Sequence, residues 1–111
     1  MPKPSVRKPP DHLSALARAF WQSVVTEYQV DDAPALELLR LAAEALDRGA
    51  QARDVLDRDG ITCVDRWGQV RAHPACAIER DSRIGVARLL RELRVLDAVP
   101  ESRIPMLERT S

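Results

Sequence analysis

Apolar residues return at spacings of three and four along three separate segments of this 111-residue chain. That period places them on one face of an α-helix, whereas a strand would alternate every second residue. Leucine and alanine supply most of these positions and aromatic residues make up only 4% of the chain, which also favours helices. The sequence therefore predicts a mainly α fold of three helices around a small core.

The first helix is expected to begin at Asp11 as its cap and to end near Gln29. Its apolar face contains a series of residues at helical spacing: Leu13, Leu16, Ala17, Phe20, Val24 and Tyr28. These side chains are therefore predicted to be its buried face.

The second helix is expected to run from about Ala33 towards Asp59, after an acidic Asp31-Asp32 cap and with Pro34 in its first turn. Gly49 is expected to bend it and Gly60 to stop it. Its apolar stripe contains Leu36, Leu39, Ala43, Leu46 and Ala50, widened by Leu38, Leu41 and Ala42. A stripe this wide predicts burial on more than one side, within the subunit or against another copy.

Two short β-favouring runs, 61–64 and 69–71, flank Arg66-Trp67-Gly68. They predict a small β-hairpin at about 61–72, before the last helix. His73-Pro74 is expected to open that helix, which would cover 75–96, because proline is preferred at the first helical position. His73 is interpreted as shaping this junction.

The last helix separates into an apolar and a basic face. The apolar arc contains Ile78, Val86, Leu89, Leu90, Leu93 and Leu96. The basic arc contains Arg80, Arg83, Arg91 and Arg94, with Arg88 at its margin. These arginines are predicted to bind DNA, because a guanidinium can bond two phosphate oxygens at once. The alternative is a solvated face in which Arg88 pairs with Glu92.

Segments rich in proline and charge are expected at both ends of the helical domain, which is predicted to cover 11–98. Residues 1–10 hold four prolines together with Lys3, Arg7 and Lys8, which predicts a flexible basic arm that either enters a DNA groove or only aids solubility. Residues 99–111 contain two further prolines and are predicted to be an extended tail. Four tail residues are predicted to contact either another protein or a neighbouring copy of this chain: Arg103, Ile104, Met106 and Leu107.

The chain has zero formal net charge, but an acidic middle, 31–65, lies between two basic flanks. Any attraction to DNA must therefore come from the distribution of charge. No phosphate-binding glycine loop, nucleophile elbow or paired-carboxylate motif is present, so no enzyme activity, catalytic residue or cofactor is expected. Cys63 and Cys76 lack metal-ligand spacing and are interpreted as reduced thiols of a cytoplasmic protein. No metal is expected, because these cysteines have no ligand cluster near them. No membrane is expected as a partner, because no segment has the ~20 apolar residues of a membrane helix.

A series of short motifs follows in a fixed order from Gly60 to residue 105. It comprises Gly60-Ile61, the hairpin end Gly68-Gln69-Val70-Arg71-Ala72-His73-Pro74, then Ala87, Leu90 and Leu93, and finally Val99-Pro100-Glu101-Ser102-Arg103. In this order they resemble one family of phage terminase small subunits, which has a glycine hairpin, a His-Pro dipeptide, an amphipathic helix and a Pro-x-Ser-Arg tail. The chain departs from the family where Leu96-Asp97-Ala98-Val99-Pro100 replaces a Leu-Gly-Leu-Thr-Pro segment.

The resemblance implies a helical subunit that assembles into a closed homo-oligomeric ring in the host bacterial cytoplasm. It further implies binding to the packaging site of phage double-stranded DNA and regulation of the ATPase and nuclease of the large terminase subunit. Trp67 at the hairpin tip would stack on a base or anchor a neighbouring copy. The alternative is a small dimeric helical DNA-binding regulator or adaptor, although Asp31 and Asp32 would repel phosphate at a helix-turn-helix link.

Overall fold

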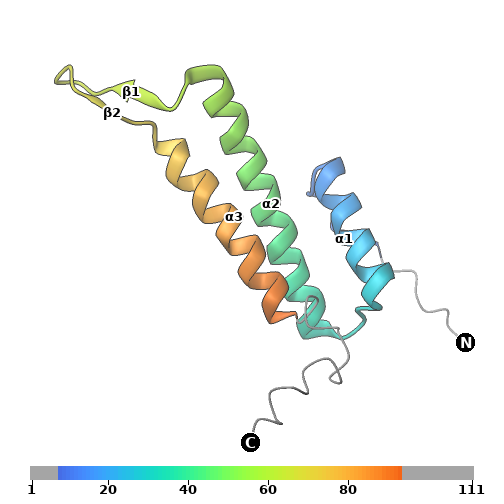
Figure 1. The fold of residues 1–111 in the computed structure, drawn as a ribbon. Helices are drawn as coiled ribbons and strands as arrows, with labels where there is room; N and C mark the ends of the chain where they lie inside the picture. Colours follow the sequence, from blue (N-terminus) through green and yellow to red (C-terminus); the bar gives the residue numbers. More distant parts are fainter. Residues whose placement is uncertain (1–7, 94–111) are drawn as a thin grey trace, which may run out of the picture.

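In a computed structural model that describes residues 8–93, the protein consists of two long antiparallel helices, preceded in the chain by a shorter one (Figure 1). The elements follow one another as α1 (Ala15–Tyr28), α2 (Ala33–Asp59), β1 (Thr62–Val64), β2 (Val70–Ala72) and α3 (Pro74–Glu92). The prediction of three helices with a β-hairpin before the last one is confirmed. The predicted tail, 99–111, and most of the predicted arm lie outside the described residues.

Helix α1 begins three residues later than the sequence predicts. Ser14, not Asp11, is the cap, because its hydroxyl accepts the N–H of Ala17 at 3.1 Å. The N–H of Ser14 in turn donates to the carboxylate of Asp47 on α2 at 2.8 Å. This bond fixes the start of α1 against the middle of α2. The predicted end near Gln29 is confirmed, since Gln29 caps the helix in the left-handed conformation with φ 51°.

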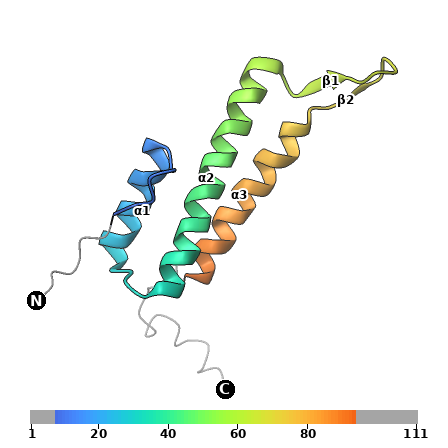
Figure 2. The ribbon, with the colours of Figure 1, turned by 180° about the vertical axis from the view of Figure 1, so that it is seen from behind.

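Helix α2 matches the expected boundaries. The carboxylate of Asp32 accepts the N–H of Ala35 at 3.1 Å, Pro34 lies in the first turn, and Gly60 caps the other end. The helix continues through Gly49, where a bend was expected. Figures 1 and 2 show α1 running along the first half of α2 in the opposite direction, and α3 lying beside α2 over most of its length.

The hairpin joins α2 to α3 and extends beyond the ends of both helices (Figure 1). Its strands pair antiparallel, with Val64 opposite Val70 and Thr62 opposite Ala72. Gly68 has φ 82°, a conformation that favours glycine, and closes the turn by donating its N–H to the carbonyl of Asp65 at 3.0 Å. The predicted turn around Gly68 is therefore confirmed.

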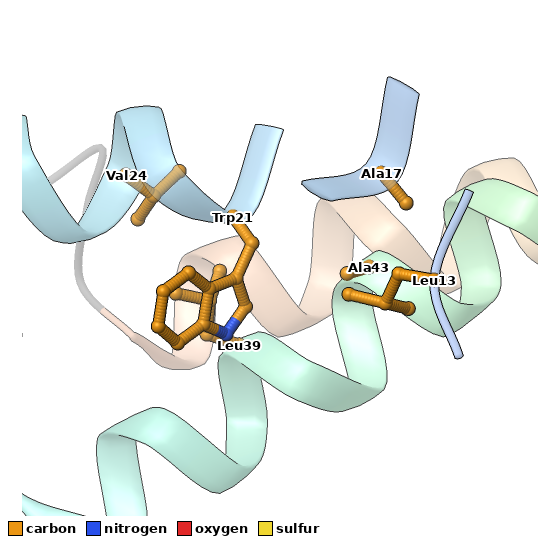
Figure 3. Close-up of a cluster of buried hydrophobic side chains, with 6 residues drawn as sticks. All are labelled: Leu13, Ala17, Trp21, Val24, Leu39 and Ala43. Atoms are coloured by element: carbon orange, nitrogen blue, oxygen red, sulfur yellow. The ribbon is translucent and has the colours of Figure 1, made fainter. Parts of the chain in front are cut away.

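The core lies where α1 covers α2, and the last turns of α3 pack against it. Its buried side chains are Leu13, Ala17, Trp21, Val24, Leu39 and Ala43 (Figure 3). Two residues expected on the buried face of α1 are exposed instead, Leu16 at 61% and Tyr28 at 45%. Trp21, absent from the predicted face, is only 4% exposed. The buried face of α1 is thus rotated towards Trp21, because that large ring packs over Leu39.

The face that α3 turns towards α2 also differs from the predicted arc. Ala75 and Ser82 are its buried residues, whereas Ile78 is 44% exposed. Small side chains occupy the inner positions because the two helices approach closely at Gly49. A Cβ atom built on Gly49 would lie 3.2 Å from the Cβ of Ser82. Gly49 therefore permits close packing of the helices rather than a bend.

We expect Gly49→Val to destabilise the protein by about 1–3 kcal/mol, because its side chain must push α2 and α3 apart. Gly85→Val is the matched control, since a Cβ on Gly85 meets no atom within 4 Å. Valine there should be neutral or slightly stabilising, because glycine is the poorer helix former. Urea unfolding of both variants measures the free energies. Equal effects at the two positions would contradict the close approach at Gly49.

Candidate nucleic-acid interface

The outer face of α3 presents three exposed arginines, Arg80, Arg88 and Arg91. The guanidinium of Arg80 lies 3.4 Å from Asp81 and its side chain is 59% exposed. Within residues 8–93, Arg88 and Arg91 make no ion pair, so the alternative pair between Arg88 and Glu92 is not formed there. A helix rises about 1.5 Å per residue, so Arg80 and Arg91 are about 16 Å apart along the axis. That length can follow several phosphates of a DNA backbone.

Arg83, predicted on the same face, is bonded to a carboxylate of its own helix, Glu79, which also pairs with α2. Its Nη2 atom lies 3.2 Å from one oxygen of Glu79, and Nη2 of Arg53 on α2 lies 2.7 Å from the other. The Glu79 side chain is only 15% exposed. The hydrogen bond from Arg83, reinforced by the charge of Arg53, lowers the pKa of the Glu79 carboxyl. Because Arg83 is already bonded to a carboxylate, we expect it to contribute less to phosphate binding than Arg88 and Arg91, which make no ion pair within residues 8–93.

One apolar residue, Ile84, interrupts the basic face. It is 48% exposed and lies four residues after Arg80 and four before Arg88, on the same side of α3. The face therefore combines charge with an apolar contact.

A carboxylate organises the hairpin tip. One oxygen of Asp65 accepts the N–H groups of Trp67 and Gln69, both at 2.9 Å, and the other accepts Nε of Arg71 at 2.6 Å. The bond from Arg71, followed by that from Gln69, lowers the pKa of Asp65. The tip is thereby held in one shape and presents Trp67 outward, 71% exposed, with the guanidinium of Arg66 at 4.7 Å from its ring centroid.

His73 performs the junction role that its position predicts. Its Nδ1 atom accepts the N–H of Ala75 at 3.0 Å and so caps α3, while Nε2 lies 3.1 Å from the carboxylate of Asp59. Hydrogen bonds from Arg58 and then from His73 lower the pKa of Asp59. Cys63 and Cys76 are free, half-buried thiols at the base of the hairpin. Across residues 8–93, no three histidine, cysteine or acidic side chains gather as metal ligands would.

A groove that was not predicted from the sequence runs along the middle of α2 and α3. It has a volume of about 530 Å³, and its apolar lining includes Leu16, Leu46, Ala50, Val86, Ala87 and Leu90. Arg53, Asp54, Glu79 and Arg83 also line it. The available signal was the breadth of the apolar stripe on α2, which continues past the region that α1 covers.

Of the predicted site residues near the two ends of the chain, the structure describes Lys8. Lys8 is exposed at the start of the described chain. The others lie outside residues 8–93: Lys3, Arg7, Arg94, Arg103, Ile104, Met106 and Leu107. Among the described helices, none is long and apolar enough to cross a membrane.

Fold and site together define a small helical protein: an antiparallel helix pair tipped by a β-hairpin, with a basic outer face on its last helix. Comparisons of the chain with family models, curated proteins and solved structures found no match. The family resemblance noted in the sequence therefore remains a prediction.

Proposed function

We propose that this protein is the small subunit of a phage terminase. In this role it binds phage double-stranded DNA through the outer face of α3 and regulates the large ATPase and nuclease subunit. The observation that carries the proposal is the exposure of Arg80, Arg88 and Arg91 on the side of α3 that does not pack against α2. Non-specific DNA affinity comes from such phosphate contacts, so a protein with zero net charge can bind DNA through one concentrated face.

The ordered motifs of the resemblance support the same proposal. The glycine turn at Gly68, the His73-Pro74 start of α3 and the amphipathic helix that follows occur in the family's order. A closed ring in the host cytoplasm, phage or prophage origin of the chain, and contact of the tail with a partner all belong to this proposal.

The alternative function, a small dimeric DNA-binding regulator, would use α2 as a recognition helix. Asp32 caps that helix and Asp31 precedes it, so its first turn presents negative charge where phosphate would approach. In addition, α1 lies along α2 and covers its first half (Figure 2). Both observations favour α3 as the DNA-binding helix.

We expect the protein alone to show no ATPase or nuclease activity, and to change the ATP turnover of its cognate large subunit when the two are mixed. The reason is that the proposed role acts through a partner motor. Steady-state ATPase assays with and without DNA measure this effect. Deleting the chain after Arg103 separates two roles of the tail: retained assembly with lost regulation indicates docking of the large subunit, and lost assembly indicates a contact between copies.

A large subunit whose turnover is the same with and without this protein would contradict the regulatory role. The large subunit for this assay should be the product of a large-terminase gene next to the gene of this chain, so that the two proteins are cognate partners. Mass measurement of the purified protein then separates the two functions, since a simple dimer favours the regulator.

A further inference from the structure

The hairpin exposes an unusual amount of apolar surface for so small an element. Ile61, Val64, Trp67 and Val70 are between 65% and 71% exposed. Val64 and Val70 are directly paired across the strands, so their side chains lie on one face of the hairpin. Contiguous apolar surface of this kind usually marks an interface.

The groove between α2 and α3 is a second apolar surface without a partner in residues 8–93. Leu16, Val86 and Leu90 supply its apolar walls, and Ala50 and Ala87 leave space between them. A volume of about 530 Å³ lies within the size range of sites that bury a large ligand. An aromatic side chain with its flanking residues is therefore of suitable size to enter it.

A single copy cannot bring its own hairpin into its own groove. The hairpin extends away from the ends of α2 and α3, whereas the groove is lined by residues 45–54 and 79–90 in their middle (Figures 1 and 2). The short connections at Gly60 and His73 hold the hairpin in that direction, since the N–H of His73 donates to the carbonyl of Ile61 at 2.8 Å. A hairpin that enters such a groove must therefore enter the groove of another copy.

One pair of opposite charges is available at the two surfaces. Arg53 and Arg83 in the groove are both bonded to Glu79. This leaves Asp54 as the groove's unpaired charge within residues 8–93. Arg66 lies over the Trp67 ring, and within residues 8–93 it makes no ion pair. Asp54 lines the groove and also makes no ion pair with any described residue. Tryptophan and arginine are the residues most enriched at the energetic centres of protein interfaces.

We propose that the hairpin tip of one copy docks in the α2–α3 groove of the next copy, with Trp67 inserted between the helices and Arg66 paired to Asp54. One contact then covers both apolar surfaces. Because it joins two different surfaces, it is heterologous, and it leaves a free hairpin at one end and a free groove at the other. Such a contact continues from copy to copy until a ring closes. The inference therefore deepens the proposed ring, and it does not depend on DNA binding.

Two variants test the contact, one on each surface. Trp67→Ala removes the inserted side chain, and Ala87→Lys fills the groove with a charge that repels Arg66. Both positions are exposed, so both variants should fold as the wild type does. Each is expected to weaken self-association about 30-fold or more, the loss typical of an interface centre. Native mass spectrometry at micromolar concentration measures the result.

The decisive measurement is the equal mixture of the two variants. Trp67→Ala retains an intact groove and Ala87→Lys retains an intact hairpin, so the mixture should form heterodimers and stop there. Wild-type protein should form assemblies larger than a dimer. The charge pair gives a second test: Asp54→Arg and Arg66→Asp should each weaken assembly, and the double variant should restore it.

Four outcomes would overturn the inference. If Trp67→Ala assembles to the same mass as the wild type, the hairpin tip is not part of the interface. Loss of assembly only in Ala87→Lys indicates a symmetric groove-to-groove dimer, and a mixture that stays monomeric excludes the proposed complementarity. A monomeric wild type would also overturn it. DNA binding is measured separately by titration, so its failure can be distinguished from failure of this contact.

Discussion

Reversing Arg80, Arg88 and Arg91 to glutamate is expected to lower DNA affinity about 100-fold at physiological salt, because each phosphate contact contributes roughly fivefold through counterion release. The three side chains are exposed and lie on the side of α3 that faces away from α2. Their loss should weaken binding to all DNA sequences similarly. The slope of log affinity against log salt should also flatten by about 0.9 for each contact removed. Fluorescence anisotropy over a salt series measures both quantities.

A control with the same change in net charge separates this face from general electrostatics. Arg18, Arg48 and Arg58 are exposed on α1 and α2, and their reversal to glutamate changes the charge equally. Because Arg58 is bonded to Asp59, circular dichroism must first show that this control folds as the wild type does. We expect this control to reduce affinity much less and to leave the salt slope nearly unchanged. Equal losses in the two triple variants would show that α3 is not the DNA-binding face. The basic arm with Lys3, Arg7 and Lys8 would then become the better candidate.

Arg83 is left out of the reversed set because of its contact with Glu79. Reversing it would replace the guanidinium bonded to Glu79 with a second negative charge one helical turn away, and would disturb the bridge from Arg53. A loss of DNA binding in that variant would therefore mix an altered α2–α3 contact with a lost phosphate contact.

The order of the elements could be predicted because each boundary has a local cause. Asp32 with Pro34, Gly60, Gly68 and His73-Pro74 each stop or start an element through their own backbone geometry or capping bond. Such signals depend only on neighbouring residues. The boundaries of α2 and the turn of the hairpin were therefore accessible from sequence.

The inward faces of α1 and α3 could not be predicted fully, because they depend on what each helix meets. Trp21 is buried since Leu39 and Val24 surround it, while Leu16 points towards the open groove. On α3, Ser82 is buried by the close approach at Gly49, which hydrophobic periodicity cannot signal. The same limit holds for the site. The basic face could be predicted as a pattern, but the contact between Arg53 and Glu79 joins residues 26 positions apart in the sequence.

Replacing Leu39 with alanine is expected to cost about 2–5 kcal/mol of the free energy of unfolding. Leu39 is fully buried beneath Trp21, where α1 packs on α2 (Figure 3). Its loss would leave a cavity that the surrounding helices can only partly fill. Small domains have roughly 5–15 kcal/mol in total, so the variant should be close to unfolded at elevated temperature. Urea denaturation followed by circular dichroism measures the change.

Leu41→Ala is the matched control, because it makes the same substitution two residues away on the same helix. Leu41 is 39% exposed and does not belong to the core cluster, so its loss should cost less than about 1 kcal/mol. Both variants must be measured at one protein concentration, since self-association adds to apparent stability. If Leu41→Ala proves as costly as Leu39→Ala, the second side of α2 is also buried. A stability difference that grows with protein concentration would then identify another copy of the chain as the cover. A loss of less than about 1 kcal/mol in Leu39→Ala itself would contradict the packing of α1 on Leu39.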